Sequence, residues 1–141
     1  MKPPDADVHE KVRQWLVYAD EDLLLAQHSF SLPSSPPYRL IAYHAQQCAE
    51  KCLKAYLVFH LVDFPYTHRI APLLDLCTEH GAWAAKVRDA EALSPYAITA
   101  RYPGEDEAIV ESEARRAIEI AERLRNAIRK ALQDEGLEIT A

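Results

Sequence analysis

Apolar residues recur at steps of three and four along the first part of the chain, which predicts a long amphipathic helix. The predicted helix runs from about Asp5 to Phe30. Asp5 and Asp7 suit its first turn, where unpaired backbone N–H groups and the helix dipole favour carboxylates. Its apolar positions are Val8, Val12, Trp15, Leu16, Ala19, Leu23 and Ala26. The next segment, 31–37, holds three prolines and three serines and predicts a loop.

A second helical pattern follows the loop and predicts a helix from about Tyr38 to Leu61. Its predicted apolar face consists of Leu40, Ile41, Ala45, Cys48, Cys52, Ala55, Tyr56 and Phe59. A separate polar strip lies along the same helix and is made of Gln47, Glu50, Lys51 and Lys54. The prolyl segment 64–66 predicts the break after this helix.

Three shorter patterns complete the chain. Thr67 is the predicted N-cap of a short helix that ends near His80, with Gly81 as its left-handed stop. A further helix is predicted over residues 82–92 and an irregular turn over 94–103. The last helix is predicted over residues 107–133; it opens with acidic and closes with basic side chains, as the helix dipole favours.

These elements predict an all-α fold, an up-down four-helix bundle with a short fifth helix. The 141 residues, 49% of them hydrophobic, suffice for one core, so we expect a single domain, 1–141, with its core at about 7–133. No export signal and no membrane span is recognisable, which predicts a cytoplasmic protein. The 3 cysteines are expected to be reduced and buried. A net charge of −6 restricts any RNA contact to a local surface.

The polar strip of the second helix has two interpretations. Gln47, Glu50, Lys51 and Lys54 follow the spacing i, i+3, i+4 and i+7, so they share one side of a helix. They form either a solvated face with Glu50–Lys54 and Gln47–Lys51 pairs, or part of a ligand site. Both interpretations stay open at the level of spacing.

Two other segments carry residues that can bind an anion. His68 stands where the chain enters the short helix, and free N–H groups at a helix start favour phosphate. Arg101 can bind a phosphate bidentately, and the adjacent Tyr102 can stack on a base. The structural alternatives are capping at His68, and a Tyr102 that closes the bundle end while Arg101 pairs with a carboxylate such as Glu50.

No metal site and no cofactor is predicted. His44, Cys48 and Cys52 share a helix face, but the outer two lie about 12 Å apart along the axis at 1.5 Å per residue. Zinc bonds of about 2 Å cannot span that separation. A stripe of the core is the better interpretation of these residues.

The order of these motifs resembles the HEPN domain family of prokaryotes. The resemblance extends from about Val12 to Leu132. It is carried by Ala19, residues 22–26, the run Ala45 to Ala55, Thr67-His68 and Ala100-Arg101-Tyr102-Pro103. It implies a bundle of four main helices plus a short fifth, a homodimer, and a minimal nucleotidyltransferase as partner. It also implies roles in nucleotide binding or in toxin–antitoxin systems.

Three functional hypotheses follow from the residues and the resemblance. The first is a nucleotide- or RNA-associated bundle, with Gln47, Glu50, Lys51, Lys54, His68, Arg101 and Tyr102 binding the ligand. The second is a metal-independent endoribonuclease toxin using Arg39 and His44, because HEPN nucleases pair an Arg with a His and have four to six residues between the two. The third is a non-catalytic dimerisation module.

Overall fold

The computed structural model describes residues 4–98 and 108–139, all of whose regular elements are helical. α1 (Pro4–His28) and α2 (Tyr38–Phe59) are joined through η1 (Ser29–Ser31), a single 3-10 turn. α3 (Ile70–Thr78) is short, η2 (Ala82–Ala97) is a run of 3-10 turns, and α4 (Glu111–Asp134) closes the bundle. The all-helical prediction is confirmed.

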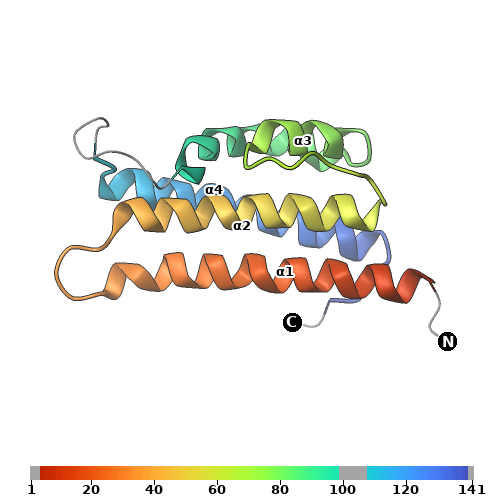
Figure 1. Ribbon diagram of the computed structural model, residues 1–141, viewed down its shortest axis with the longest axis horizontal. Helices are drawn as coiled ribbons and strands as arrows, with labels where there is room; N and C mark the ends of the chain where they lie inside the picture. Colours follow the sequence, from red (N-terminus) through yellow and green to blue (C-terminus); the bar gives the residue numbers. More distant parts are fainter. Residues whose placement is uncertain (1–3, 99–107, 140–141) are drawn as a thin grey trace.

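α2 occupies the centre of the bundle. It packs against α1, α4, α3 and η2, and Figure 1 shows α1 on one side of it and the α3–η2 pair on the other. The four main elements α1, α2, η2 and α4 alternate in direction, while α3 runs beside them as the short fifth helix (Figure 1). The segment after α2 therefore has to run back along the bundle before α3 begins, which brings residues 62–69 alongside α2.

The core follows the predicted helical spacing. On α1 the buried apolar positions are Val12, Leu16, Ala19, Leu23 and Ala26. On α4 they are Ala114, Ala117, Ile118, Ile120, Ala121, Leu124, Ile128 and Leu132. Many of these side chains are alanines, which allow the helix axes to approach closely.

Two helices end in the same way with different residues. After α2, Leu61 adopts φ 57° and the Val62 N–H donates to the Leu57 carbonyl at 2.9 Å. After α4, Gly136 adopts φ 109°, and the Leu137 N–H donates to the Leu132 carbonyl at 2.9 Å. This is the left-handed hydrogen-bonded helix stop, in which glycine has no steric penalty. A leucine at the end of α2 carries that penalty, and its side chain is 76% exposed.

The prediction of a left-handed stop at Gly81 is wrong. Gly81 is extended, with φ −148° and ψ 130°. A side chain at this position would overlap the Trp83 indole and approach the Tyr56 hydroxyl to 2.8 Å. The close packing of these two aromatic residues, rather than a positive φ, requires glycine here.

Other predicted boundaries also shift. Arg69, not Thr67, occupies the N-cap position of α3, and the Ser94 hydroxyl accepts the Ile70 N–H at 2.9 Å. The element after Gly81 is 3-10 rather than α-helical and includes Pro95. α4 starts at Glu111 rather than residue 107, and its last turn carries no basic residue.

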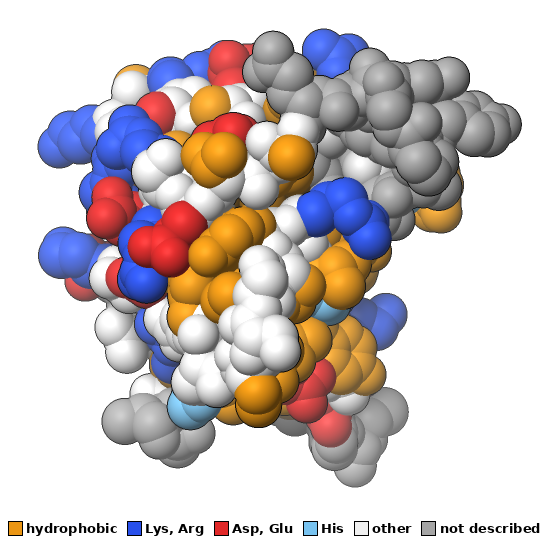
Figure 2. Space-filling view, turned by 90° about the vertical axis from the view of Figure 1, so that its left-hand side faces the viewer, with side chains coloured by type: hydrophobic (Ala, Val, Ile, Leu, Met, Phe, Trp, Pro, Cys, Tyr) orange, Lys and Arg blue, Asp and Glu red, His pale blue; other side chains and the backbone are white. Residues whose placement is uncertain are grey.

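Hydrophobic side chains also reach the surface at the end of the bundle where η2 stops and α4 starts. Figure 2 shows them gathered in the middle of that face, with charged groups beside them. Exposed large apolar residues on the elements that meet there are Leu32, Leu40, Ile98 and Val110. A second set lies on the outer side of α1 and consists of Val17, Tyr18, Leu24 and Leu25.

Candidate functional site

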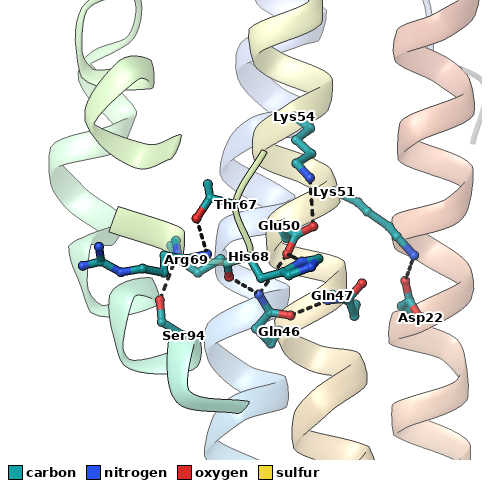
Figure 3. A network of polar contacts seen from close by, with 11 residues as sticks. Asp22, Gln46, Gln47, Glu50, Lys51, Lys54, Thr67, His68, Arg69 and Ser94 are labelled. Carbon is teal, nitrogen blue, oxygen red and sulfur yellow. Dashed lines mark hydrogen bonds and ion pairs between the residues drawn. The ribbon is translucent and has the colours of Figure 1, made fainter. Parts of the chain in front are cut away.

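A buried carboxylate, Glu50, is the centre of the polar strip on α2. The residue is 3% exposed. Lys54 Nζ lies 3.0 Å from its Oε2, on the same helix four residues on. Gln46 Nε2 donates to Oε1 at 3.2 Å, and His68 Nδ1 lies 3.0 Å from the same oxygen. Figure 3 shows these side chains converging from α2 and from the segment that precedes α3. We call Gln46, Glu50, Lys54 and His68 the Glu50 cluster.

The cluster keeps Glu50 ionised although it is buried. Burial raises the pKa of the Glu50 carboxyl. Hydrogen bonds from Lys54, His68 and Gln46 together lower it by more than burial raises it, so the pKa lies below its ordinary value. A buried charge with its partners in place is tolerated, whereas one without them is costly. Glu50 therefore orders the groups around it.

Gln46 connects α2 to the segment before α3. It is 0% exposed, and its Nε2 also donates to the His68 carbonyl at 2.7 Å. Its Oε1 accepts a hydrogen bond from Gln47 Nε2 at 2.7 Å. Both ends of the Gln46 amide are thus engaged. Gln46 fixes the backbone at His68, and Glu50 contacts the His68 ring.

Lys54 is a buried cation, not a surface one. It is 8% exposed, and its Nζ lies 5.7 Å from the ring centre of Trp15 and 5.6 Å from that of Phe64. Cation–π attraction from two sides adds to its pair with Glu50. The prediction of a solvated face is therefore wrong for Glu50 and Lys54, although their predicted pairing is confirmed.

Lys51 points to α1 rather than to Gln47. Its Nζ donates to Asp22 Oδ2 at 2.5 Å. His44 Nδ1 lies 2.8 Å from the other oxygen of the same carboxylate. The Asp22 side chain is 12% exposed, and those of Lys51 and His44 are each 25% exposed. Asp22 thus joins two predicted site residues, and the sequence pattern did not single it out for that role.

The predicted pair Arg39 and His44 does not share a helix face. Five residues correspond to about 140° of rotation at 3.6 residues per turn. His44 faces Asp22 on α1, and Arg39 is exposed in the first turn of α2. The predicted ligand residues come from three segments of the chain. The structure brings α2 and His68 together, while Arg101 and Tyr102 lie outside the described residues.

The segment before α3 presents an exposed surface above the Glu50 cluster. Tyr66 is 94% exposed, and its ring centre lies 5.7 Å from that of His68 in a T-shaped contact. The His68 side chain is 55% exposed despite its contact with Glu50. Arg69 is exposed, and its guanidinium has no ion pair within 4–98 or 108–139. We call Tyr66, His68 and Arg69 the loop surface.

The importance of Tyr66 was missed from the sequence. Tyr66 follows Pro65, so the sequence pattern indicates only that it belongs to the break after the second helix. The available signal was an aromatic residue followed within three positions by a histidine and an arginine, in a segment without helical periodicity.

The thiols take no part in either surface. Cys48, Cys52 and Cys77 are free and buried, as predicted. A hydrogen bond with Cys52 and burial raise the pKa of Cys48, and burial raises that of Cys77 to about 12. Within the part of the chain that the structure describes, no group of histidine, cysteine and acidic residues has metal-binding geometry. None of its helices is both long and apolar enough to cross a bilayer.

These features define a helical bundle whose central helix carries a buried polar motif next to an exposed aromatic and basic loop. The sequence matches the HEPN domain family over residues 12–131. The chain therefore belongs to the HEPN domain family. No curated protein and no solved structure matched the sequence.

Proposed function

We propose that this HEPN protein is a nucleotide- or RNA-associated bundle that contacts its ligand through the loop surface. The observation that carries the proposal is the contrast between a buried network and an exposed rim. Gln46 and Glu50 fix the backbone and the ring of His68. Tyr66, two residues earlier, remains almost fully exposed.

The chemistry of the loop surface suits a nucleotide. An exposed tyrosine offers a face on which a base can stack, and stacking is tolerant of base identity. The Arg69 guanidinium, which has no ion pair among the described residues, can hold a phosphate through two parallel hydrogen bonds. The imidazole of His68 adds a second nitrogen, Nε2, that can form a hydrogen bond with the ligand while Nδ1 faces Glu50. Such a local site is compatible with a net charge of −6.

The remaining predicted ligand residues have supporting or adjacent roles in this proposal. Glu50 and Lys54 position the loop, and Gln47 completes the hydrogen bonding of Gln46. Lys51 is one quarter exposed and neutralises Asp22 at the edge of the same region. Arg101 and Tyr102 stay proposed contacts on the strength of their side-chain chemistry and of the family resemblance.

Titration with ATP, GTP and a fluorescein-labelled single-stranded RNA of ten nucleotides tests the site. We expect Tyr66→Ala to weaken binding about five-fold or more, since one stacked base contributes about 1–3 kcal/mol. Arg69→Gln should weaken RNA binding and also make it less dependent on salt. Tyr18→Ala is the matched control, because Tyr18 is exposed on the outer side of α1. Binding that is equal in the parent, Tyr66→Ala and Arg69→Gln proteins contradicts the proposal.

A second candidate function is endoribonuclease activity that uses His44 and Arg39. The observation in its favour is the Asp22 carboxylate 2.8 Å from His44 Nδ1. A carboxylate on one ring nitrogen orients the other nitrogen for proton transfer. RNA cleavage by the parent, and its loss in both His44→Ala and Arg39→Ala proteins, would favour this function. Cleavage that persists in both variants would reject it.

The third candidate is a dimerisation module, and we propose a homodimer with or without a minimal nucleotidyltransferase as partner. The outer side of α1 supports it, because Val17, Tyr18, Leu24 and Leu25 are each more than half exposed. Light scattering during size-exclusion chromatography measures the mass at low and high salt. A dimer on this apolar face should persist at high salt and dissociate in the Leu24→Glu variant. Association with a nucleotidyltransferase requires co-purification of the two proteins.

A further inference from the structure

A separate cleft lies between η2 and α4. It encloses about 630 Å³, within the range of small-molecule pockets, roughly 300–1,000 Å³. Its apolar lining comes from Ala92 and Leu93 on η2 and from Ala117 and Ile120 on α4. None of its lining residues belongs to the Glu50 cluster or to the loop surface.

Within the described residues, the arginine and aspartate side chains that line this cleft are paired, with one exception. Arg88 pairs with Asp75 at 2.8 Å and also with Glu91. Asp89 pairs with Arg123 at 2.6 Å. These pairs leave little charge on the η2 side for a ligand.

Arg116 is the exception on the α4 side. It lines the cleft and is exposed, and its guanidinium has no hydrogen bond or ion pair within the described ranges 4–98 and 108–139. An unpaired guanidinium next to an apolar floor attracts an anion that carries an apolar body. The cleft therefore offers both a cationic anchor and a hydrophobic surface.

The neighbour of Arg116 limits the charge of that anion. Glu113, one turn earlier on α4, also lines the cleft and accepts a hydrogen bond from the Tyr96 hydroxyl at 2.9 Å. Tyr96 is neutral, since burial and Glu113 raise the pKa of its hydroxyl. The neutral hydroxyl does not offset the Glu113 carboxylate, which repels a dianion such as a phosphate monoester more strongly than a monoanion. A singly charged carboxylate meets this restriction.

We propose that the cleft between η2 and α4 binds a small organic carboxylate, with its apolar body on Leu93, Ala117 and Ile120 and its carboxylate on Arg116. The site is distinct from the proposed RNA contact. Its ligand is neither a nucleotide nor a macromolecule.

Titration of the full chain with 2-naphthoate, followed by backbone amide NMR, tests the proposal. We expect saturable binding with shifts at residues of η2 and α4. Arg116→Gln should weaken it about ten-fold or more, as the loss of a charged hydrogen bond predicts. Ala92→Phe should weaken it by filling the cleft. Arg115→Gln is the matched control, because Arg115 is the adjacent arginine, lies outside the cleft and pairs with Glu111.

Two analogues define the chemistry of the ligand. 2-Naphthamide, which has no charge, should bind more weakly and equally well to the parent and Arg116→Gln proteins. 2-Naphthyl phosphate should bind more weakly than 2-naphthoate because of Glu113. Absence of saturable binding, equal affinity in the Arg116→Gln and Arg115→Gln proteins, or tighter binding of the phosphate each overturns the proposal. Arg115 and Arg116 are both exposed on α4, so this pair of variants decides the question even if Ala92→Phe does not fold.

Discussion

Two ion pairs of this protein have the same spacing and the same length but lie in different surroundings. Glu50–Lys54 on α2 and Lys130–Asp134 on α4 are both i, i+4 pairs with 3.0 Å between nitrogen and oxygen. The Lys54 and Glu50 side chains are 10% and 4% exposed, whereas those of Lys130 and Asp134 are 78% and 65% exposed. Their spacing and their nitrogen–oxygen distance are therefore matched. The acidic residue and the order of the two charges along the helix differ, but the largest difference is burial.

The comparison shows how one motif can serve as a surface pair or as an organising centre. On α4, water solvates both charges, so the pair adds little to stability. On α2, water is excluded, so each charge depends on its partners, and those partners come from α1, α2 and the segment before α3. The buried i, i+4 pair on α2 therefore fixes the position of the segment before α3.

The largest expected effect comes from removing the buried cation. Lys54→Ala leaves the Glu50 carboxylate with only His68 and Gln46 as partners, and loss of one member of a buried pair costs about 3–5 kcal/mol. The urea midpoint of unfolding should fall accordingly. RNA binding should also weaken, although Lys54 does not touch the proposed ligand, because the loop surface loses its support.

The double variant Glu50→Gln/Lys54→Met sharpens the first prediction. Replacing both charges by uncharged side chains of similar size should recover much of the stability lost in Lys54→Ala. A double variant as unstable as the single one would show that packing, rather than an unpaired charge, caused the loss.

Acidification should remove the stabilisation that the ionised Glu50 gives to the buried cluster. The pKa of Glu50 is lower in the folded chain than its ordinary value, so its ionised form stabilises the fold. This contribution is present above the unfolded pKa, near 4.3, and disappears as the pH falls through the lower folded value.

Denaturant melts between pH 7 and pH 3 measure this contribution. The Glu50→Gln protein should be less stable than the parent at pH 7 and should lose less stability below pH 4. Parallel pH profiles for the two proteins would show that other carboxylates dominate.

The hydrogen bond between Tyr56 and Glu135 is less buried than the Glu50–Lys54 pair and more buried than the Lys130–Asp134 pair. Its loss should therefore lower the free energy of unfolding by an intermediate amount. The Tyr56 hydroxyl donates to Glu135 Oε2 at 2.9 Å; Tyr56 is 0% exposed, while the Glu135 side chain is 33% exposed. Tyr56→Phe removes a hydrogen bond to a charged group, for which about 1.5–3 kcal/mol is expected.

Alkaline melts separate this hydrogen bond from simple packing. Burial raises the pKa of Tyr56 to about 12, and Glu135 also raises it. The neutral phenol thus stabilises the fold below its unfolded pKa, near 10, and that contribution is lost as the pH rises toward 12. Tyr56→Phe should remove this part of the alkaline loss. Identical alkaline profiles for the parent and the variant would refute the assignment.

The fold was largely predictable because the core depends on repeated local patterns. The apolar spacing of α1, α2 and α4 is visible in the sequence, and most of the predicted positions are buried. Leu40, predicted on the apolar face of the second helix, is 39% exposed because it lies in the first turn of α2, at the end of the bundle. Boundaries were less predictable. Ser94 caps α3 from 24 residues away, and Gly81 is required by the contact between Tyr56 and Trp83. Such distant partners leave no mark on local periodicity.

The candidate site was predictable in its residue types but not in its burial. The spacing correctly placed Glu50 and Lys54 together. It could not reveal that residues 62–69 return along α2 and cover that pair, because the path of a loop is set by the packing of the whole bundle. For the same reason Lys51 was assigned to Gln47 on its own helix, whereas its partner is Asp22 on α1.

The smallest expected effect belongs to the exposed pair, and it is the one that most directly checks the role of burial. Lys130→Ala should change the free energy of unfolding by at most about 0.5 kcal/mol, since exposed i, i+4 pairs contribute about 0.3–0.5 kcal/mol and alanine favours helix. The urea midpoint of this variant should lie close to that of the parent and approach it further at 1 M salt, which screens surface charges. A loss comparable to that of Lys54→Ala would mean that spacing and distance, which the two pairs share, matter more than exclusion of water. In that case burial of the Glu50 cluster would not explain how the loop surface is held in place.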